Sequence, residues 1–386
     1  MVNTRAKFKK SGSLIGSNDD ILTEILRRLP AKAILRFKSV SKHWLSLLSH
    51  SHFTSLYSKR VISPGLFVRD FYVPFDAEKQ KFPPFRSLDF YPDLCGIKIV
   101  QSCNGLFLCC SAKGNERSRK YYVFNPTTKQ FAVIPSVPGG QDVRKTICFT
   151  GLGYHQRKCV HFKVVCIRNV MPNGELFQIQ VYSSNLGKWK IINESFNAPY
   201  YTPYRYAVYW NGAIHWAPSY LNPSYFNLDK EKLQTLPLPE EVTQYKDYRD
   251  GSMPLYFGES RGHLHLVENA PGDKSLHLNV YEMLSDHSGW FVKYQVDFHE
   301  LPTTYPEMIQ NQENPSSPHY YKFEVFDVVR GEKEQDSFMV VRIAGKIIRY
   351  NITDKSFKQI YNLDNIFCGK IGSFMVHRYT ESLTSF

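Results

Sequence analysis

The spacing of hydrophobic positions changes near residue 60, from a helical period to a strand period. In the first helical segment, apolar residues lie at i, i+4, i+5 and i+8, namely Ile21, Ile25, Leu26 and Leu29. This spacing is typical of one stripe of an amphipathic helix. The first sixty residues therefore predict a helical unit that is distinct from the rest of the chain.

Capping residues and a proline divide this unit into short helices. We expect Asp19 or Asp20 to cap the first helix, and Pro30 to end it and to suit the first turn of the next. The second helix should carry Ala33, Ile34, Leu35 and Phe37. A third should start near Ser41 and carry Trp44, Leu47 and Leu48, and a fourth should run through Phe53, Leu56 and Tyr57. So small a unit buries little of its surface on its own, and its surplus of apolar residues should stay exposed until a partner covers them.

From Val61 onward, short runs of Val, Ile, Phe and Tyr alternate with Gly, Pro and Asn clusters, which favours β-strands. One unit recurs: an aromatic residue ends a strand, a turn follows, and an aromatic residue or Leu opens the next strand seven residues later. The instances are Phe124 to Phe131, Tyr182 to Trp189, Phe226 to Leu233 and Tyr350 to Phe357, with a longer version from Tyr281 to Trp290.

A small sheet repeated along the chain is typical of a β-propeller. We therefore predict an α+β multidomain protein, with a small all-α module followed by a large all-β, kelch-like propeller of about six blades. A β-sandwich is the alternative. Closure of the ring should place residues 65–69 and 371–377 in the same or adjacent blades. The expected domains are a flexible basic tail (1–17), the helical module (18–60) and the propeller (61–386).

Composition supports a packed protein, because 42% of the 386 residues are hydrophobic and 15% are aromatic. No apolar run is long enough to span a membrane, and the first residues lack the apolar core of a signal peptide. We therefore expect the nucleus or the cytoplasm as the location, with no membrane partner. The eight cysteines lack paired metal-binding spacing and should be reduced and mostly buried.

The net charge of +13 raises the question of nucleic-acid binding, which requires clustered Lys and Arg. Here the basic residues are dispersed among acids, apart from a loop patch at 117–120 and a tail containing Arg5, Lys7, Lys9 and Lys10. Specific nucleic-acid binding is therefore not expected. The tail is interpreted as solvated and flexible, with a role in nuclear import as the alternative.

Several motifs resemble chemical sites, but a structural role explains each better. Gly151-Leu-Gly-Tyr lacks the third glycine of a dinucleotide fingerprint and is interpreted as a strand and turn. His263 and His265 share one side of a strand without a third metal ligand nearby. No nucleophile motif is present, although distant carboxylates could converge. We expect no catalytic residue, metal or cofactor, and we assign the tryptophans mainly to blade packing, with a surface role as the alternative for Trp210 and Trp216.

Three stretches do not fit regular strands, at residues 197–206, 240–251 and 302–321. Long loops are often functional, and tyrosine gives a large contact area with few rotatable bonds. The candidate target-binding residues are therefore Tyr200, Tyr201, Tyr204 and Tyr206. The alternative is that these loops are insertions without a binding role.

The helical module resembles the F-box. The matching residues are Asp20-Ile-Leu-Thr-Glu-Ile-Leu, Arg28-Leu-Pro, Ile34-Leu-Arg-Phe, Val40-Ser-Lys-His-Trp44 and Phe53; where members usually open with Leu-Pro, this chain has Ser17-Asn18. The resemblance implies docking on a SKP-type adaptor and, through it, on a cullin. The implied adaptor-binding residues are Ile21, Ile25, Leu29, Pro30, Ile34, Leu35, Phe37, Val40 and Trp44. Some of these, Trp44 above all, are also candidates for the module's own core.

The β-rich part is similar to the F-box-associated interaction domain of plant F-box proteins. The landmarks include Ser102-Cys-Asn-Gly-Leu, Phe124-Asn-Pro-Thr-Thr, Gly151-Leu-Gly-Tyr, Tyr209-Trp-Asn-Gly-Ala-Ile-His-Trp and Tyr379-Thr-Glu-Ser-Leu. The two resemblances imply a non-catalytic substrate receptor of an SCF-type ubiquitin ligase, whose β domain binds an unknown target protein. A propeller enzyme or carbohydrate-binding protein with an accessory helical module is the alternative.

Overall fold

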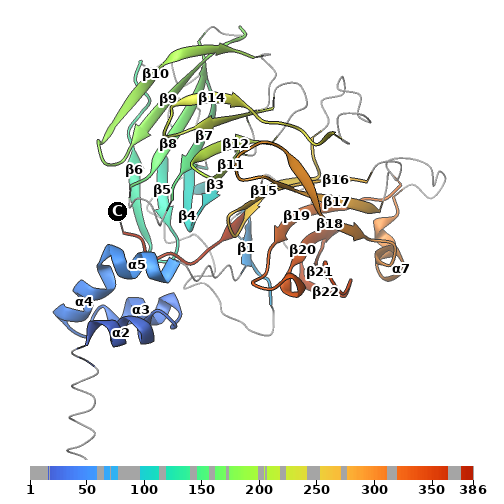
Figure 1. Cartoon of the computed structure of the whole chain (residues 1–386), viewed down its shortest axis with the longest axis horizontal. Coiled ribbons are helices and arrows are strands. Elements are labelled where there is room, and N and C mark those ends of the chain that lie inside the picture. Colours follow the sequence, from blue (N-terminus) through green and yellow to red (C-terminus); the bar gives the residue numbers. More distant parts are fainter. Residues whose placement is uncertain are drawn as a thin grey trace, which may run out of the picture.

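The computed structural model shows a helical module attached to a propeller of six sheets (Figure 1). It describes residues 16, 18–58, 65–69, 71–76, 96–112, 119–139, 146–155, 161–170, 174–198, 204, 207–217, 223–240, 253–270, 276–310, 320–363 and 375–385. Among these residues, no helix combines the length and the hydropathy that a bilayer crossing requires.

The helical module comprises α2 (Asp19–Leu26), α3 (Ala31–Phe37), α4 (Lys42–Ser49) and α5 (Ser51–Ser58). The predicted cap of the first helix is wrong by one residue: the side chain of Asn18 accepts a hydrogen bond from the Ile21 amide at 3.0 Å. Asp19 and Asp20 lie instead in the first turn, where their charge favours the helix dipole. Asn18 thus starts the helix at the place where F-box sequences usually carry proline.

The buried stripe of α2 is offset from the predicted one. Leu22 and Leu26 face the module's core, whereas Ile21 and Ile25 lie on the solvent side. The core also contains a leucine from the far end of the chain, Leu383. The four apolar positions of the predicted stripe are therefore divided between an inner and an outer face.

The six sheets are the blades of the propeller, and each is strictly antiparallel. Blade 1 holds β2 (Phe71–Pro74), β1 (Gly65–Val68) and β23 (Val376–Tyr379); blade 2 holds β3 (Ile97–Cys103), β4 (Leu106–Ser111), β5 (Tyr121–Asn125) and β6 (Gln130–Ile134). Blade 3 holds β7 (Ile147–Gly153), β8 (Lys163–Asn169), β9 (Leu176–Ser183) and β10 (Lys188–Asn197); blade 4 holds β11 (Ala207–Trp210), β12 (Ala213–Trp216), β13 (Ser224–Asn227) and β14 (Lys232–Thr235).

The last two blades come from the C-terminal third of the chain. Blade 5 holds β15 (Tyr256–Ser260), β16 (His263–Asn269), β17 (His277–Met283) and β18 (Trp290–Asp297); blade 6 holds β19 (Glu324–Val329), β20 (Phe338–Ile343), β21 (Lys346–Asn351) and β22 (Phe357–Asn362). The short helices α7 (Leu301–Thr304), η3 (Pro306–Met308) and η4 (Glu334–Asp336) lie between strands. The predicted propeller of about six blades is confirmed.

Blade 1 closes the ring by joining the two ends of the propeller chain. β1 pairs antiparallel with β23, with Gly65 opposite Tyr379 and Val68 opposite Val376. This confirms the prediction that the two segments share a blade, although residues 371–374 lie outside the described ranges. The pairing covers the hydrogen-bonding edge that an open ring would expose.

The recurring sequence unit is the outer hairpin of a blade. Its two hydrophobic residues lie directly opposite each other, as in Phe124 with Phe131 and Tyr182 with Trp189. The longer unit differs, because Trp290 lies opposite Met283 and not Tyr281. Between the first two strands of three blades, the Asn104, Asn211 and Arg261 turns combine a positive φ with a following positive-φ glycine, as a type I′ hairpin requires.

Tryptophan side chains fasten neighbouring blades together. Trp189 of blade 3 donates its indole N–H to the carbonyl of Pro135 at 2.9 Å, and Trp290 of blade 5 donates to Pro237 at 2.7 Å. Trp210 of blade 4 donates across this same boundary, to the Gly262 carbonyl of blade 5 at 2.7 Å. The predicted role in blade packing is thus confirmed for these residues, and Trp216 is buried as well.

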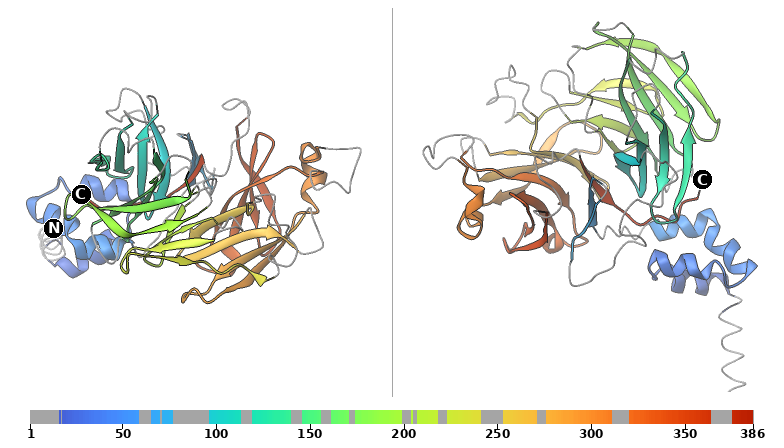
Figure 2. Two further views of the ribbon diagram at one scale, coloured as in Figure 1. Left: turned by 90° about the horizontal axis from the view of Figure 1, so that it is seen from above. Right: turned by 180° about the vertical axis from the view of Figure 1, so that it is seen from behind.

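The innermost strands β23, β3, β7, β11, β15 and β19 end on one side of the ring. Cys103, at the end of β3, donates its thiol to the Tyr154 carbonyl just beyond β7 at 3.4 Å. Arg378, near the end of β23, reaches the carbonyl of Val328 near the end of β19. The helical module lies on this side (Figure 2), which we call the proximal face, and the side where the inner strands begin is the distal face.

Candidate functional site

The helical module exposes a group of large apolar side chains. The exposed fractions are 44% for Ile21, 48% for Ile25, 58% for Val40 and 49% for Leu45. They come from α2, from the turn after α3 and from α4. We call these four residues the apolar face. The sequence analysis did not identify Leu45. Leu45 follows Trp44 in a predicted helix whose inward-facing positions are already occupied by other apolar residues, so an outward-facing leucine could have been expected there.

The other predicted adaptor-binding residues lie deeper. Pro30 is exposed, and Leu29, Leu35, Phe37 and Trp44 are half-buried against the module's core; the Phe37 and Trp44 rings meet edge to face at 5.6 Å. Ile34 is fully buried. Its predicted role in direct adaptor contact is therefore corrected to a role in the module's own packing.

The C-terminal residues 380–384 form a strap between the helical module and the propeller. Leu383 inserts into the module's core with no exposed surface. One carboxylate oxygen of Glu381 accepts hydrogen bonds from the Ala31 amide at 3.3 Å and from the Tyr57 hydroxyl at 3.2 Å. The strap thus connects the first residue of α3 and the Tyr57 side chain of α5 to the C-terminal segment.

The same strap is held to blades 2 and 3. The Asn125 amide donates to the carbonyls of Ser382 at 3.1 Å and Thr384 at 2.8 Å. The hydroxyls of Tyr154 and Thr384 lie 2.6 Å apart, and the Ser382 amide donates to Thr127 at 3.1 Å. Because these groups are buried, the bonds fix the module on the proximal face.

A cavity of about 1010 Å³ lies in the centre of the ring, lined by residues of all six inner strands. Arg378 holds Asp327 there through two nitrogens, one at 2.8 Å, and the Tyr256 hydroxyl donates to the same carboxylate at 2.8 Å. Burial opposes the charge of Arg378, but the Asp327 carboxylate outweighs it and raises the pKa of the guanidinium. This carboxylate is therefore committed to a structural ion pair.

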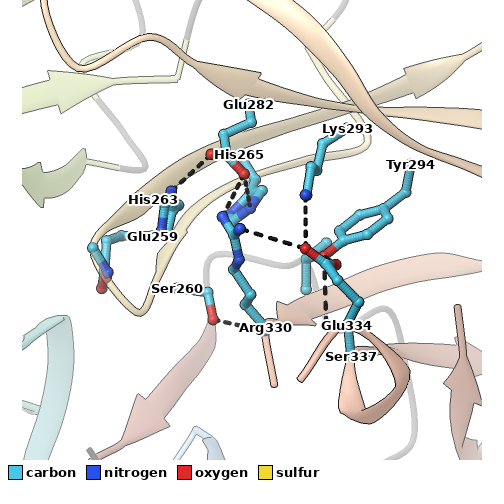
Figure 3. A network of polar contacts seen from close by, with 12 residues as sticks. Glu259, Ser260, His263, His265, Glu282, Lys293, Tyr294, Arg330, Glu334 and Ser337 are labelled. Carbon is cyan, nitrogen blue, oxygen red and sulfur yellow. Dashed lines mark hydrogen bonds and ion pairs between the residues drawn. The ribbon is translucent and has the colours of Figure 1, made fainter. Parts of the chain in front are cut away.

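A second ionic network joins blades 5 and 6 beside the cavity (Figure 3). Glu282 binds Arg330 at 2.7 Å and His263 at 2.7 Å, while His265 lies 3.6 Å from its second oxygen. Burial would raise the pKa of Glu282, but the adjacent His265, His263 and Arg330 side chains lower it to about 2. The two histidines thus serve this carboxylate, in agreement with the structural interpretation of their spacing.

The distal part of the cavity is lined by cations without acidic partners. Lys98 lies at the start of β3, and Arg119 lies just before β5. Within the described ranges neither forms an ion pair, and the buried Nε of Arg119 has no hydrogen-bond acceptor. Sequence reasoning noted the basic loop patch that includes Arg119 but could not place it at a cavity.

Tyr204 also lines this cavity, but it is a core residue. Its side chain is only 3% exposed, and its ring packs edge to face on Trp216 at 5.6 Å and on Phe177 at 5.5 Å. The prediction that Tyr204 presents its ring to a target is therefore corrected, although its buried hydroxyl has no hydrogen-bond partner. Tyr200, Tyr201 and Tyr206 lie outside the described residues.

Among the described residues, one group has donor atoms spaced for a metal ion. The ligand atoms of His277, Asp297 and His299 lie within 4.8 Å of one another. His299 Nδ1 is hydrogen-bonded to Asp297 at 2.5 Å, and the Lys355 ammonium lies 3.5 Å from the other carboxylate oxygen. The carboxylate thus already has two partners. No sequence motif marks this group, because His277 begins β17 whereas Asp297 ends β18 and His299 follows it.

Comparison with known proteins divides the chain in the same way as the structure. An F-box domain model matches residues 18–56, and a model described as the F-box associated beta propeller domain matches residues 74–383. An F-box protein of Arabidopsis thaliana is 33% identical over 382 residues, which cover 92% of this chain and 88% of the relative.

Two further Arabidopsis thaliana proteins show shorter matches. A second F-box protein is 28% identical over 276 residues, covering 65% of this chain and 71% of the relative. An F-box/kelch-repeat protein is 30% identical over 187 residues, covering 43% and 42%. Among solved structures, a chain of the nidogen/laminin complex aligns with a TM-score of 0.40 at 9% identity, over 82% of this chain and 98% of that one.

Proposed function

This chain belongs to the plant F-box proteins that carry an F-box associated β-propeller domain, and we propose that it is the substrate-recognition subunit of an SCF-type cullin ubiquitin ligase. F-box proteins in general are non-catalytic adaptors. In this chain the F-box would dock on a SKP-type adaptor, and through it on a cullin, while the propeller holds a target protein. We also propose that it acts in the nucleus or the cytoplasm.

The observation that carries this proposal is the apolar face on an otherwise well-packed module. Leu22, Leu26 and Ile34 already fill the core, so the exposed isoleucines, valine and leucine do not stabilise the module itself. Burying each such side chain in an interface is worth roughly 1.5–3 kcal/mol. Four exposed side chains of this kind on one small module supply apolar area for a docking surface.

The strap gives the proposed receptor a fixed geometry. A ubiquitin ligase works by proximity, because holding a target near the transferring enzyme raises the local concentration of its lysines. Leu383 and Glu381 tie the adaptor-binding module to the propeller without a flexible linker at this junction. A target bound on the propeller would therefore be held at a defined distance and orientation relative to the cullin.

Adaptor binding can be tested by charging the apolar face. The double substitution Ile21→Asp with Ile25→Asp places two carboxylates in the proposed interface and leaves the core residues unchanged. We expect capture of the purified SKP-type adaptor to fall at least about a hundredfold, because each desolvated charge costs several kcal/mol. Affinity is measured by isothermal titration calorimetry, with circular dichroism to show that the helices remain folded.

The matched control is Leu186→Asp with Ile191→Asp, two exposed apolar residues of blade 3 (63% and 47%). This variant makes the same chemical change on the propeller, outside the F-box, and should bind the adaptor as the unsubstituted protein does. The docking proposal is wrong if the unsubstituted protein does not bind the adaptor, or if the folded Ile21/Ile25 variant binds it undiminished. Ile34 is unsuitable for this test, because a charge there would disrupt the module's core.

A further inference from the structure

The charged groups that line the central cavity are distributed unevenly. Toward the proximal face, Asp327 pairs with Arg378, and Arg330 pairs with Glu282. Glu259 accepts a hydrogen bond from the Gly262 amide, and Glu381 belongs to the strap. Toward the distal face, the described lining contains Lys98 and Arg119 and no acidic side chain. The acids of the cavity are thus engaged at one end, and the free positive charge is left at the other.

Arg119 and Lys98 are neighbours across blade 2. On one side of β4, Lys98 of β3 lies opposite Cys110. On the other side, Cys110 lies opposite Tyr121 of β5, and Arg119 precedes Tyr121 by two residues. Both residues line the same cavity. Because β3 and β5 run in the same direction and begin on the distal side, both side chains lie at the distal end of the cavity.

Two buried polar atoms in this cavity lack partners among the residues that the structure describes. They are the Nε of Arg119 and the hydroxyl of Tyr204, both shielded from solvent. An unmade bond to a buried donor is costly, and that cost persists only where something else compensates it. A guanidinium N–H and a tyrosine hydroxyl are both donors that an anionic oxygen would satisfy.

We propose that the distal end of the central cavity binds an anionic side chain of the target protein, either a carboxylate or a phosphorylated residue. Arg119 and Lys98 supply the charge, and Tyr204 lines the same cavity. The inference rests on the proposed function, because it names the chemistry by which the propeller holds its target. The distal position also suits this role, since the F-box and its adaptor occupy the proximal face.

The shape and charge of the site favour a peptide over a nucleic acid. A polynucleotide is held by a line of cations that follows its phosphates, with stacking surfaces for the bases. Here two cations lie at one end of a cavity of about 1010 Å³, and the Tyr204 ring is buried and offers no stacking face. That geometry accommodates one or a few side chains that enter from the distal face.

The test uses fluorescein-labelled heptapeptide pools with randomised flanks and one fixed central residue. The centre is phosphoserine, Glu or Gln, and binding to the full-length protein is followed by fluorescence anisotropy. We expect the phosphoserine pool, the Glu pool or both to bind at least about tenfold more tightly than the neutral Gln pool, and this preference to weaken with added salt. Which anionic pool binds better distinguishes the phosphate from the carboxylate.

Substitutions assign the binding to the cavity. Arg119→Ala and Lys98→Ala should each weaken binding of the favoured peptide pool about tenfold. Arg119→Lys should restore only part of this affinity, because an ammonium group cannot form the paired hydrogen bonds of a guanidinium. The matched control, Lys232→Ala, removes the same charge from an exposed position on β14 outside the cavity and should have no effect. Arg119→Ala should leave adaptor binding unchanged.

Three results would overturn the inference: equal binding of the three pools, equal loss in the Lys232 variant, or failure of both anionic pools to bind. A single-stranded oligonucleotide and the unlabelled peptide are also compared as competitors of the labelled anionic pool. If the oligonucleotide displaces this pool at a lower concentration than the peptide does, the cavity is assigned to nucleic acid instead. Adaptor capture is measured on the same preparations. Loss of adaptor binding with retained peptide binding would contradict the proposed function alone.

Discussion

Arg378 connects three blades through one guanidinium group. It lies on β23 in blade 1, pairs with Asp327 of blade 6 and donates to the Glu259 carbonyl of blade 5 at 2.8 Å. The side chains of Arg378 and Asp327 are 14% and 5% exposed, so water can replace little of this interaction. A single residue near the C-terminus thus links the first blade to the last two.

The first prediction follows from that burial. Asp327→Ala should lower the free energy of unfolding by roughly 3–5 kcal/mol, because it leaves a buried guanidinium without its partner. Glu334→Ala also removes an ion-pair partner between blades 5 and 6, but Glu334 is 55% exposed, and its loss should cost less than about 1 kcal/mol. Urea denaturation followed by tryptophan fluorescence measures both. Equal losses would contradict the role assigned to the central pair.

Single-residue roles were the least predictable from the sequence. The period of α2 indicates a helix, but whether Ile21 or Leu22 faces inward depends on α4, α5 and Leu383, which lie elsewhere in the chain. Tyr204 reads as an exposed loop tyrosine because its packing partner Trp216 belongs to a different strand. Burial is set by distant contacts, and a single sequence does not contain those contacts.

At the scale of elements, the strap is the junction on which the geometry of the receptor depends. It contributes a buried leucine to the F-box core and accepts hydrogen bonds from α3 and α5 through Glu381. The other side of the strap is bound by Asn125 and Thr127 of blade 2. The last residues of the chain therefore belong physically to both domains.

We predict that Leu383→Ala loosens the F-box selectively. Removing this buried side chain should cost roughly 2–5 kcal/mol, because it leaves a cavity in the module's core. Hydrogen exchange should accelerate in α2–α5, whereas exchange in the inner strands of blades 3 to 5 should not change. The control Leu186→Ala makes the same change at a 63% exposed position and should alter neither region. Uniform acceleration over the whole chain would show that the two domains unfold as one unit.

Elements were easier to predict than residues, since each carries its own periodic signal. The outer hairpins were visible because two hydrophobic residues seven positions apart lie opposite each other across a short turn, as in Phe226 with Leu233. The Asn-Gly pairs at 104–105 and 211–212 likewise are the sequence pattern that predicts type I′ hairpin turns. The strap has no such signal, because its structure depends on two domains at once.

At the scale of the whole molecule, buried neutral histidines in several blades make the stability of the propeller depend on pH. His215 in blade 4 is fully buried and His377 in blade 1 is 6% exposed. Burial lowers the pKa of each imidazole from 6.5 to about 3. His265 and His287 are shifted in the same direction, also by burial. The folded protein therefore keeps these imidazoles neutral at pH values where an unfolded chain would protonate them.

The sign of the effect follows from proton linkage. A lowered pKa means that the unfolded chain binds more protons below pH 6.5, so stability is fully present above that pH and falls as the pH decreases toward 3. For His215 and His377 together, the loss between pH 7.5 and pH 5 should be about 4 kcal/mol, at 1.36 kcal/mol for each pH unit below 6.5 and each group. Glu282, with a pKa of about 2, adds nothing at pH 5, because its unfolded-state value of 4.5 is not yet reached.

Urea denaturation at pH 7.5 and pH 5 measures this loss, and His377→Gln provides the comparison. Glutamine does not titrate, so the variant should lose about 2 kcal/mol less than the unsubstituted protein between the two pH values, whatever its stability at pH 7.5. If the His377 variant keeps the full pH dependence, the acid sensitivity arises elsewhere, and the buried imidazole of blade 1 is not its source.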